Sequence, residues 1–129
     1  MSNVCATITV QNLTGHEAAI QFSRKNATCG VDTSKIFTLK RKEVSSGTTV
    51  NFTTGTTELD YWWVGVQMLS GDFEHQYFAT PGTVNSPGTE DMLASSDANK
   101  THQIVVTSPE AGQFQATIKL ASGARAASL

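Results

Sequence analysis

Apolar and polar residues alternate with a period of two along most of this chain. In the first segment Val4, Ala6, Ile8 and Val10 are apolar, and the residues between them are cysteine and threonine. Successive side chains of a β-strand point to opposite faces of a sheet, so this pattern predicts half-buried strands. We expect strands over 4–11, 17–23, 36–40, 48–54, 60–69, 73–80, 102–107 and 113–121.

The segment 60–69 has the strongest β signal and is predicted to be a central strand. It contains both tryptophans and a nearly continuous apolar run, and it has no proline. Aromatic and β-branched residues fit a pleated surface, whereas proline would remove a hydrogen bond of the ladder. The alternation places Trp62, Val64, Val66 and Met68 on one face of the strand, and Tyr61, Trp63, Gly65 and Gln67 on the other.

Three short polar segments have the composition of tight turns. Gly15 ends the first, Ser70, Gly71 and Asp72 form the second, and the third covers 109–112. Glycine and asparagine favour turns because they tolerate backbone conformations that other residues avoid. We therefore predict hairpins that pair 4–11 with 17–23, 60–69 with 73–80, and 102–107 with 113–121.

The remaining segments lack the alternation. The range 24–33 is polar and is expected to be a loop, and 81–100 is a long loop rich in Pro, Gly and Ser. Within that loop only 90–94 has the composition of a helical turn. A loop of about twenty residues is uncommon in a compact domain and is often functional. The small residues of 122–129 predict a frayed tail.

Short strands separated by turns define the expected architecture. We predict an all-β fold, an antiparallel β-sandwich of about eight strands, because no helical periodicity of useful length competes with the strand pattern. The whole range 1–129 is expected to form one domain, since this length suffices for one core.

Charge and hydropathy narrow the partners. Nine basic and eleven acidic residues give a net charge of −2. The chain therefore has no excess of positive charge that would attract nucleic acid. The longest apolar run is too short to span a bilayer, so the chain is not expected to be transmembrane. Its first residues lack the pattern of a signal peptide, which predicts a cytoplasmic protein. No cofactor motif is present.

Metal and disulfide chemistry are not favoured either. Cys5 and Cys29 are expected to be reduced thiols, although they could form one disulfide. His16, His75 and His102 lie far apart in the sequence and lack the close spacing of zinc ligands. We therefore predict no metal site.

The sequence also lacks the signature of an enzyme. It contains no Gly-x-Ser-x-Gly motif around a serine nucleophile. Asp72 and Glu74 could in principle form the carboxylate pair of a glycosidase, but acids beside a turn are usually solvated. The prediction is a non-catalytic protein.

Several segments together resemble the PUD-domain family. These are small β-sandwiches of fungi and nematodes, and the family is named for being up-regulated in long-lived worms. The resemblance lies in ATITVQNLTG over 6–15, in the Thr-Thr-Gly segment over 53–55, in the Asp-x-Trp-Trp-x-Gly-Val motif over 60–66, and in a closing segment over 114–123. It implies a fold but no agreed catalytic residues. The architecture is also similar to that of aegerolysins, which are fungal lipid binders, and of fungal fruit-body lectins.

A binding function is predicted from the aromatic residues that the alternation turns away from the core. Exposed aromatic rings beside polar groups are typical of interaction sites. Three alternatives remain for Tyr61 and Trp63: the 81–100 loop covers them, they form the interface of a homodimer, or they contact a ligand. The predicted ligand site consists of Asp60, Tyr61, Trp63, Glu74, Gln76 and Asn85.

Sugar is the leading ligand class. Carboxamides and acids beside an aromatic ring suit a glycan, whereas a lipid headgroup site is expected to have few acids nearby. We therefore predict a lectin-like recognition protein with a role in defence. A membrane-lipid binder of the aegerolysin type, and a dimeric stress-response protein without a small ligand, are the alternatives.

Overall fold

The computed structural model describes residues 2–55, 58–108 and 113–129, and the fold is all-β. These residues form thirteen strands and one short 3-10 helix, η1, at Ser95–Asp97. The predicted turn at 109–112 lies outside the described residues. The longer strands are β1 (Ser2–Leu13), β2 (Ala18–Asn26), β3 (Gly30–Thr33), β5 (Thr48–Thr54), β6 (Tyr61–Met68), β11 (Thr101–Thr107), β12 (Gln115–Leu120) and β13 (Gly123–Ser128). The shorter strands are β4 (Phe37–Leu39), β7 (Tyr77–Ala79), β8 (Gly82–Thr83), β9 (Ser86–Pro87) and β10 (Thr89–Glu90).

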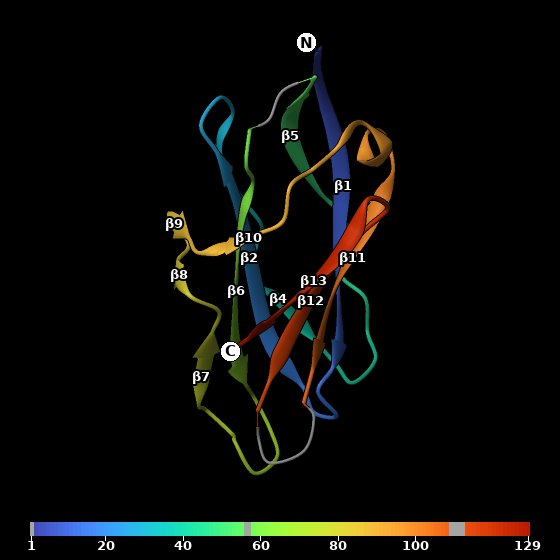
Figure 1. The fold of residues 1–129 in the computed structure, drawn as a ribbon. Coiled ribbons are helices and arrows are strands. Elements are labelled where there is room, and N and C mark those ends of the chain that lie inside the picture. Colours follow the sequence, from blue (N-terminus) through green and yellow to red (C-terminus); the bar gives the residue numbers. More distant parts are fainter. Residues whose placement is uncertain (1, 56–57, 109–112) are drawn as a thin grey trace.

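Two sheets pack face to face (Figure 1). The first sheet has the strand order β13-β12-β11-β1-β5. The second has the order β10-β6-β2-β3, with β4 also paired to β2 and β7 to β6. The β8–β9 hairpin belongs to neither sheet. Most neighbours are antiparallel, but β1 and β11 are parallel, so the expectation of a purely antiparallel arrangement is wrong.

The core lies between the sheets and follows the predicted alternation. Trp62, Val64, Val66 and Met68 of β6 are each at most 1% exposed, which confirms the inward face predicted for this strand. They contact apolar residues of the first sheet within one cluster, which includes Ile8, Val10, Val50, Phe52, Ile104, Val106, Ala116 and Ile118.

The predicted hairpin between the first two segments is wrong. β1 pairs with β5 and β11, whereas β2 pairs with β3, β4 and β6, so the two strands belong to different sheets. The connection crosses from one sheet to the other. The Asn12 side chain anchors this crossing, because its amide donates to the carbonyl oxygens of His16 at 2.8 Å and Leu39 at 3.0 Å.

Besides β8, β9 and β10 within the predicted 81–100 loop, two further segments that were predicted to be irregular are strands. β2 continues to Asn26 and turns into β3, so most of 24–33 is a hairpin. The segment predicted as a frayed tail is β13, which pairs with β12 over its whole length. The alternation misses both because their side chains do not sort into apolar and polar faces.

Two other predictions fail in the second half of the chain. The return strand expected over 73–80 is reduced to β7, and residues 72–75 form a turn in which His75 has a positive φ of 69°. Phe73 does not share a strand face with His75. Its ring packs against Phe78 and Phe114 with centroid distances of 5.9 and 5.5 Å. The helical turn expected at 90–94 is absent, and the 3-10 turn η1 follows it instead.

Candidate functional site

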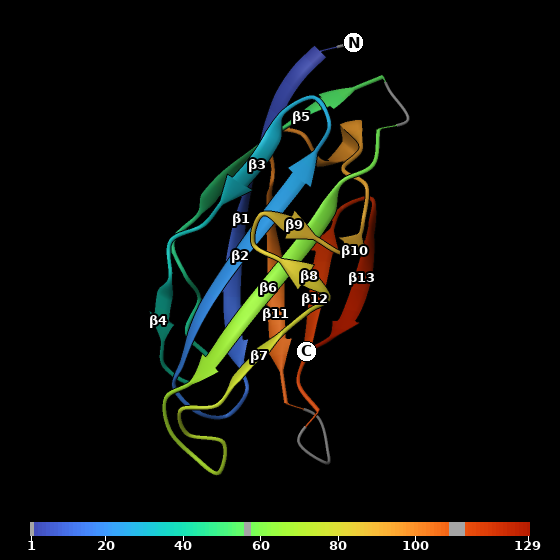
Figure 2. The same cartoon turned by 90° about the vertical axis from the view of Figure 1, so that its left-hand side faces the viewer.

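The outer face of the second sheet carries the aromatic residues on which the binding prediction rests. Figure 2 shows the β8–β9 hairpin lying across this face, in front of β2 and β6. The hydroxyl of Ser23 donates to the carbonyl oxygen of Val84 at 2.7 Å, which fixes the hairpin to β2. Ser23 is also the cross-strand neighbour of Trp63. The hairpin therefore covers Trp63, which is only 6% exposed.

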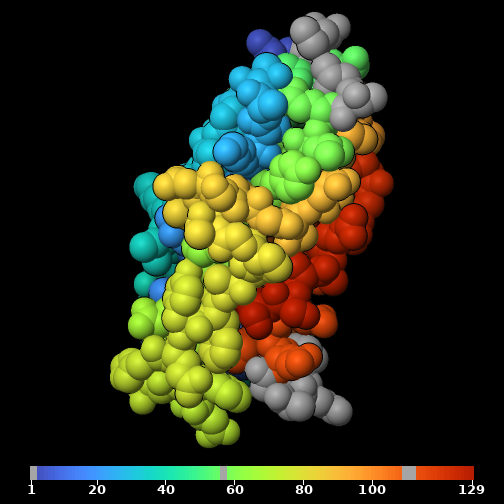
Figure 3. Space-filling model, turned by 60° about the vertical axis from the view of Figure 1, so that its left-hand side comes forward, coloured from blue at the N-terminus to red at the C-terminus, as the bar shows by residue number. Residues whose placement is uncertain are grey.

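The hairpin divides the outer face into two hollows. On one side lies the Tyr61 groove, of about 500 Å³, which is lined by Lys25, Asn26, Ala27, Glu58, Leu59, Tyr61, Ser86 and Pro87. On the other side lies the smaller Tyr77 hollow, of about 100 Å³, which is lined by Ala19, Gln21, Ile36, Trp63, Gly65, Gln67 and Tyr77. In Figure 3 the end of β2 (blue), the segment before β6 (green) and the hairpin (yellow) meet at the larger groove.

The segment 58–60 forms one wall of the Tyr61 groove, and hydrogen bonds hold it in place. The carboxylate of Glu58 accepts from the backbone N–H of Thr28 at 2.5 Å and from its hydroxyl at 2.6 Å. It also accepts from the hydroxyl of Thr53 at 3.3 Å. The bonds from Thr28 and Thr53 hold the pKa of Glu58 below its ordinary value. The wall is thereby tied to the β2–β3 turn and to the first sheet.

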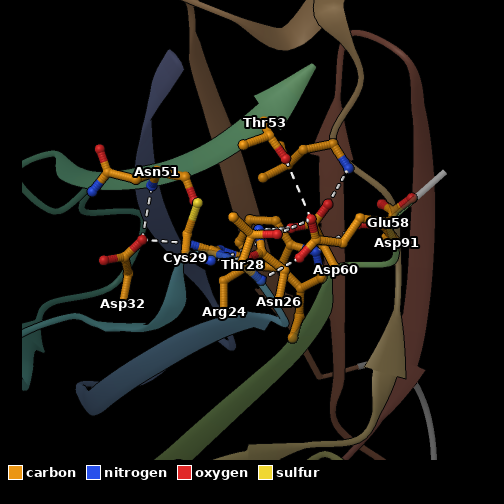
Figure 4. A network of polar contacts seen from close by, with 12 residues as sticks. Arg24, Asn26, Thr28, Cys29, Asp32, Asn51, Thr53, Glu58, Asp60 and Asp91 are labelled. Carbon is orange, nitrogen blue, oxygen red and sulfur yellow. Dashed lines mark hydrogen bonds and ion pairs between the residues drawn. The ribbon is translucent and has the colours of Figure 1, made fainter. Parts of the chain in front are cut away.

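A buried polar network lies beneath this wall (Figure 4). Arg24 is on the inward face of β2 and is 0% exposed. Its guanidinium forms an ion pair with Asp32, donates to the Asn51 carbonyl oxygen at 2.6 Å, and lies 3.6 Å from the Asp60 carboxylate. A buried charge is tolerated only with such partners, so Arg24 links β2, β3, β5 and the start of β6.

Asp60 completes the network. Its carboxylate accepts from the Asn26 side chain at 3.0 Å and from the backbone N–H of Leu93 at 2.9 Å. Burial raises the pKa of Asp60 above its ordinary value, although the hydrogen bonds from Leu93 and Asn26 and the charge of Arg24 oppose this shift. With these partners and an exposure of only 2%, Asp60 has a structural position.

Asp91 is a second acid of the same region. Its carbonyl oxygen accepts the indole N–H of Trp62 at 2.8 Å. One carboxylate oxygen, Oδ2, is buried and has no hydrogen-bond partner among the described residues. Burial raises the pKa of Asp91 to about 6, although Arg125 acts to lower it.

The structure separates the six residues of the predicted ligand site. Tyr61 lines the groove and is half-buried, and Asn85 is exposed at the tip of the hairpin beside the groove residue Ser86. Asp60 and Trp63 are buried, which corrects the expectation that they face a ligand. Glu74 and Gln76 are exposed in the segment between β6 and β7. This segment lies at the end of β6 away from the groove (Figure 1).

Sequence reasoning missed most of the groove. The neighbours of Tyr61 in the groove are Lys25, Asn26, Ala27, Leu59, Ser86 and Pro87. These residues come from three segments, 25–27, 58–59 and 86–87. The first and the last lie in polar ranges that have no alternation of apolar and polar residues. The one available signal was the polar 24–33 segment next to a strand, which proved to be the β2–β3 hairpin.

The described histidines, cysteines and acids do not gather around a common metal site. No group of three or more His, Cys, Asp or Glu among the described residues could hold a metal ion. Nε2 of His102 lies 2.8 Å from the Asp97 carbonyl oxygen, and the ring of His16 packs over Gly71. Cys5 and Cys29 are not bonded to each other. No helix of the described residues is long and apolar enough to span a membrane.

The sequence matches no protein-family model and no curated protein.

Proposed function

We propose that this protein is a non-catalytic recognition protein that binds carbohydrate in the Tyr61 groove. The observation that carries this proposal is the position of Tyr61 in a groove of about 500 Å³, where apolar and hydrogen-bonding groups line the same surface. Small-molecule sites commonly have 300 to 1,000 Å³ and combine apolar walls with a few polar groups. The ring of Tyr61 offers an apolar surface for the C–H face of a sugar.

The polar groups of the groove suit sugar hydroxyls. Lys25 supplies donors, Ser86 supplies a donor and acceptors, and Asn85 supplies an amide at the rim. Leu59 and Pro87 add apolar surface. Asn26 contributes less, because its amide is already bonded to Asp60.

The charge of the groove favours a neutral ligand. Lys25 is its one cation and Glu58 its one anion. An anionic lipid headgroup would favour several cations without nearby acids. The groove therefore suits a lipid headgroup less well than a neutral sugar, and a neutral sugar is the ligand class that we propose.

The fold that we propose for this function is a single β-sandwich of the kind found in PUD-domain proteins and fungal lectins. The motif residues Trp62 and Trp63 are buried, and Asp60 belongs to the buried network. These residues therefore support the fold and the wall of the groove, and they are not proposed to contact the sugar.

A glycan array followed by calorimetry with the best glycan tests the function. We expect Tyr61→Ala to weaken binding at least about tenfold, which corresponds to about 1.4 kcal/mol. Tyr61→Phe should retain most of the affinity, because it keeps the ring. Tyr77→Ala is the matched control, because Tyr77 is 59% exposed on the same outer face but lies outside the groove.

Three outcomes would contradict the proposal. One is that no glycan binds, and another is that Tyr77→Ala weakens binding as much as Tyr61→Ala. The third is that the protein pellets with liposomes and binds no sugar, which would favour the lipid alternative. Circular dichroism of each variant establishes that the fold is retained.

A further inference from the structure

Among the described residues, no strand pairs with the outer edge of β13, the last strand of the first sheet. β13 pairs with β12 in an antiparallel register in which Gln115 opposes Ser128 and Leu120 opposes Gly123. The N–H of Leu129 donates to the Phe114 carbonyl oxygen, so this pair is a hydrogen-bonded one. Such pairs alternate along antiparallel strands. The N–H and C=O groups of Ala124, Ala126 and Ser128 must therefore point away from β12, toward the edge of the sheet.

Among the described residues, this edge has few of the features that usually protect an edge strand, and Arg125 is its one charged residue. Natural edges carry lysine, proline or a bulge, or another segment covers them. β13 has the sequence GARAAS, and Gly123 to Ala126 and Ser128 are exposed. Figure 2 shows the strand at the rim of the molecule. A groove of about 370 Å³ lies beside it, between residues 125–128 and Pro81, Gly88, Thr89 and Glu90.

The other ends of the sheets differ from β13. At the opposite end of the first sheet, the backbone of Asn51 in β5 is bonded to the side chains of Asp32 and Arg24, which closes the gap to β3. At the end of the second sheet, β10 has only two residues. The remaining edge strands of the described residues, β3, β4 and β7, have at most four residues each. Within the described part of the chain, β13 therefore offers the longest free template for another strand.

We propose that β13 is an interface for a second copy of this chain, which pairs with it edge to edge in an antiparallel, twofold-symmetric way. A twofold axis at Ala126 places Ala126 opposite Ala126 of the second copy, and Ala124 opposite Ser128. Every outward-pointing residue of one strand then meets an outward-pointing residue of the other. The pairing forms six backbone hydrogen bonds and joins the two first sheets into one.

The side chains and charges are compatible with this register. Ala124, Ala126 and Ser128 are small, so no side chain obstructs the approach. The same axis sets Arg125 opposite Ala127 of the second copy. The two Arg125 residues of the dimer, the one charged residue of each β13, are therefore not directly opposite each other. Like charges directly opposite each other would destabilise such a pair. An isologous interface of this kind closes at the dimer and does not propagate.

Light scattering over about two decades of protein concentration tests the proposal, because dimer formation follows mass action. We expect the mass to rise toward that of a dimer for the native chain. Ala126→Pro removes the central N–H, and Ala126→Lys sets two like charges opposite each other. Both variants should stay monomeric over the whole concentration range. Ala121→Lys adds the same charge in the neighbouring turn and should still dimerise.

Cross-linking tests the register itself. In a background with Cys5→Ser and Cys29→Ser, a single Ala126→Cys places the two thiols in one cross-strand pair, with Cα atoms about 5.5 Å apart. Ala124→Cys is the matched control, because the two copies of residue 124 are offset by four residues, or about 14 Å. A bis-maleimide too short to span 14 Å should link the first variant and not the second.

Each contrary result has a defined meaning. A native chain that stays monomeric at every concentration overturns the proposal. A dimer that persists in folded Ala126→Pro and Ala126→Lys places the interface elsewhere, and equal cross-linking of both cysteine variants rejects the register. None of these results depends on sugar binding, so the interface and the Tyr61 groove are tested separately.

Discussion

At the scale of single residues, the most informative side chain is Arg24. It carries a full charge at 0% exposure, and it reaches Asp32, Asp60 and the backbone of Asn51 from one strand. Two of its nitrogens, Nε and Nη1, have no hydrogen-bond partner among the described residues, although Nη1 lies 3.6 Å from Asp60. The network is therefore held by charge as much as by hydrogen bonds.

The first prediction concerns this buried pair. Arg24→Met should lower the free energy of unfolding by about 3–5 kcal/mol, because it leaves buried Asp60 without its cation. In the Arg24→Met background, Asp60→Asn should lower the free energy of unfolding by less than it does in the native chain, because the two residues interact directly. Urea denaturation of both single variants and the double variant gives the coupling energy. A coupling energy near zero would show that the two charges do not interact.

Asp91 leads to a prediction about pH. Its pKa is about 6 in the folded protein and near 3.8 in an ordinary environment, so the folded state binds the proton more tightly. The contribution of Asp91 to the free energy of unfolding is fully present below about pH 4 and is lost as the pH rises through about 6. Asp91→Asn should therefore stabilise the protein above pH 7, by no more than about 1–2 kcal/mol after solvent screening.

Urea midpoints measured from pH 4 to pH 8 check this expectation. The native chain and Asp91→Asn should converge at the acid end and separate above pH 6. A constant difference at every pH would mean that the carboxylate of Asp91 has an ordinary pKa.

At the scale of elements, Gly65 in the middle of β6 determines how the aromatic rings pack on the outer face. A Cβ atom at this position would lie 2.4 Å from Cη2 of Trp63 and 2.4 Å from the Tyr77 hydroxyl. Both side chains therefore rest on the bare backbone of the strand. The glycine is required by this close approach, and its position between two strand residues is otherwise unfavourable.

Gly65→Ala should destabilise the protein by about 1–3 kcal/mol, the usual cost of overpacking. The Tyr77 ring can swing toward solvent, but the Trp63 ring is held beneath the β8–β9 hairpin. Tryptophan fluorescence should shift to longer wavelength as Trp63 is displaced. Gly65→Ala in a Tyr77→Ala background separates the two contacts. If that double variant regained full stability, the Trp63 contact would not be the cause.

The alternation predicted most strands because burial of one face imposes it. β5 was predicted with its observed bounds, and β6 to within two residues. Alternation does not specify which strands pair, because a turn within a sheet and a crossing between sheets leave the same pattern in the strands that flank them. The segment after β1 has a typical turn composition, yet its Asn12 bonds hold a crossing.

At the scale of the whole molecule, the all-β class was predictable and the functional surface was only partly so. Tyr61 was predicted to face outward, and it does line the groove. Trp63 has the same strand face, but the β8–β9 hairpin buries it. Cover by the 81–100 loop was one of the three alternatives, and it is what the structure shows for Trp63. No local pattern could choose among the alternatives, because the bond between the hairpin and Ser23 is a tertiary contact.

The parallel pairing of β1 with β11 has a consequence for how the chain acquires its structure. Thr7 of β1 lies beside Thr101, and Leu13 beside Thr107, so their partners are separated by more than ninety residues of sequence. Contacts of such high order slow folding, because the entropy of closing the intervening loop is lost before they form. During synthesis β1 leaves the ribosome long before β11 exists. One edge of β1 therefore stays unpaired until β11 has been synthesised, and an unpaired strand edge of this kind is prone to aggregation during folding.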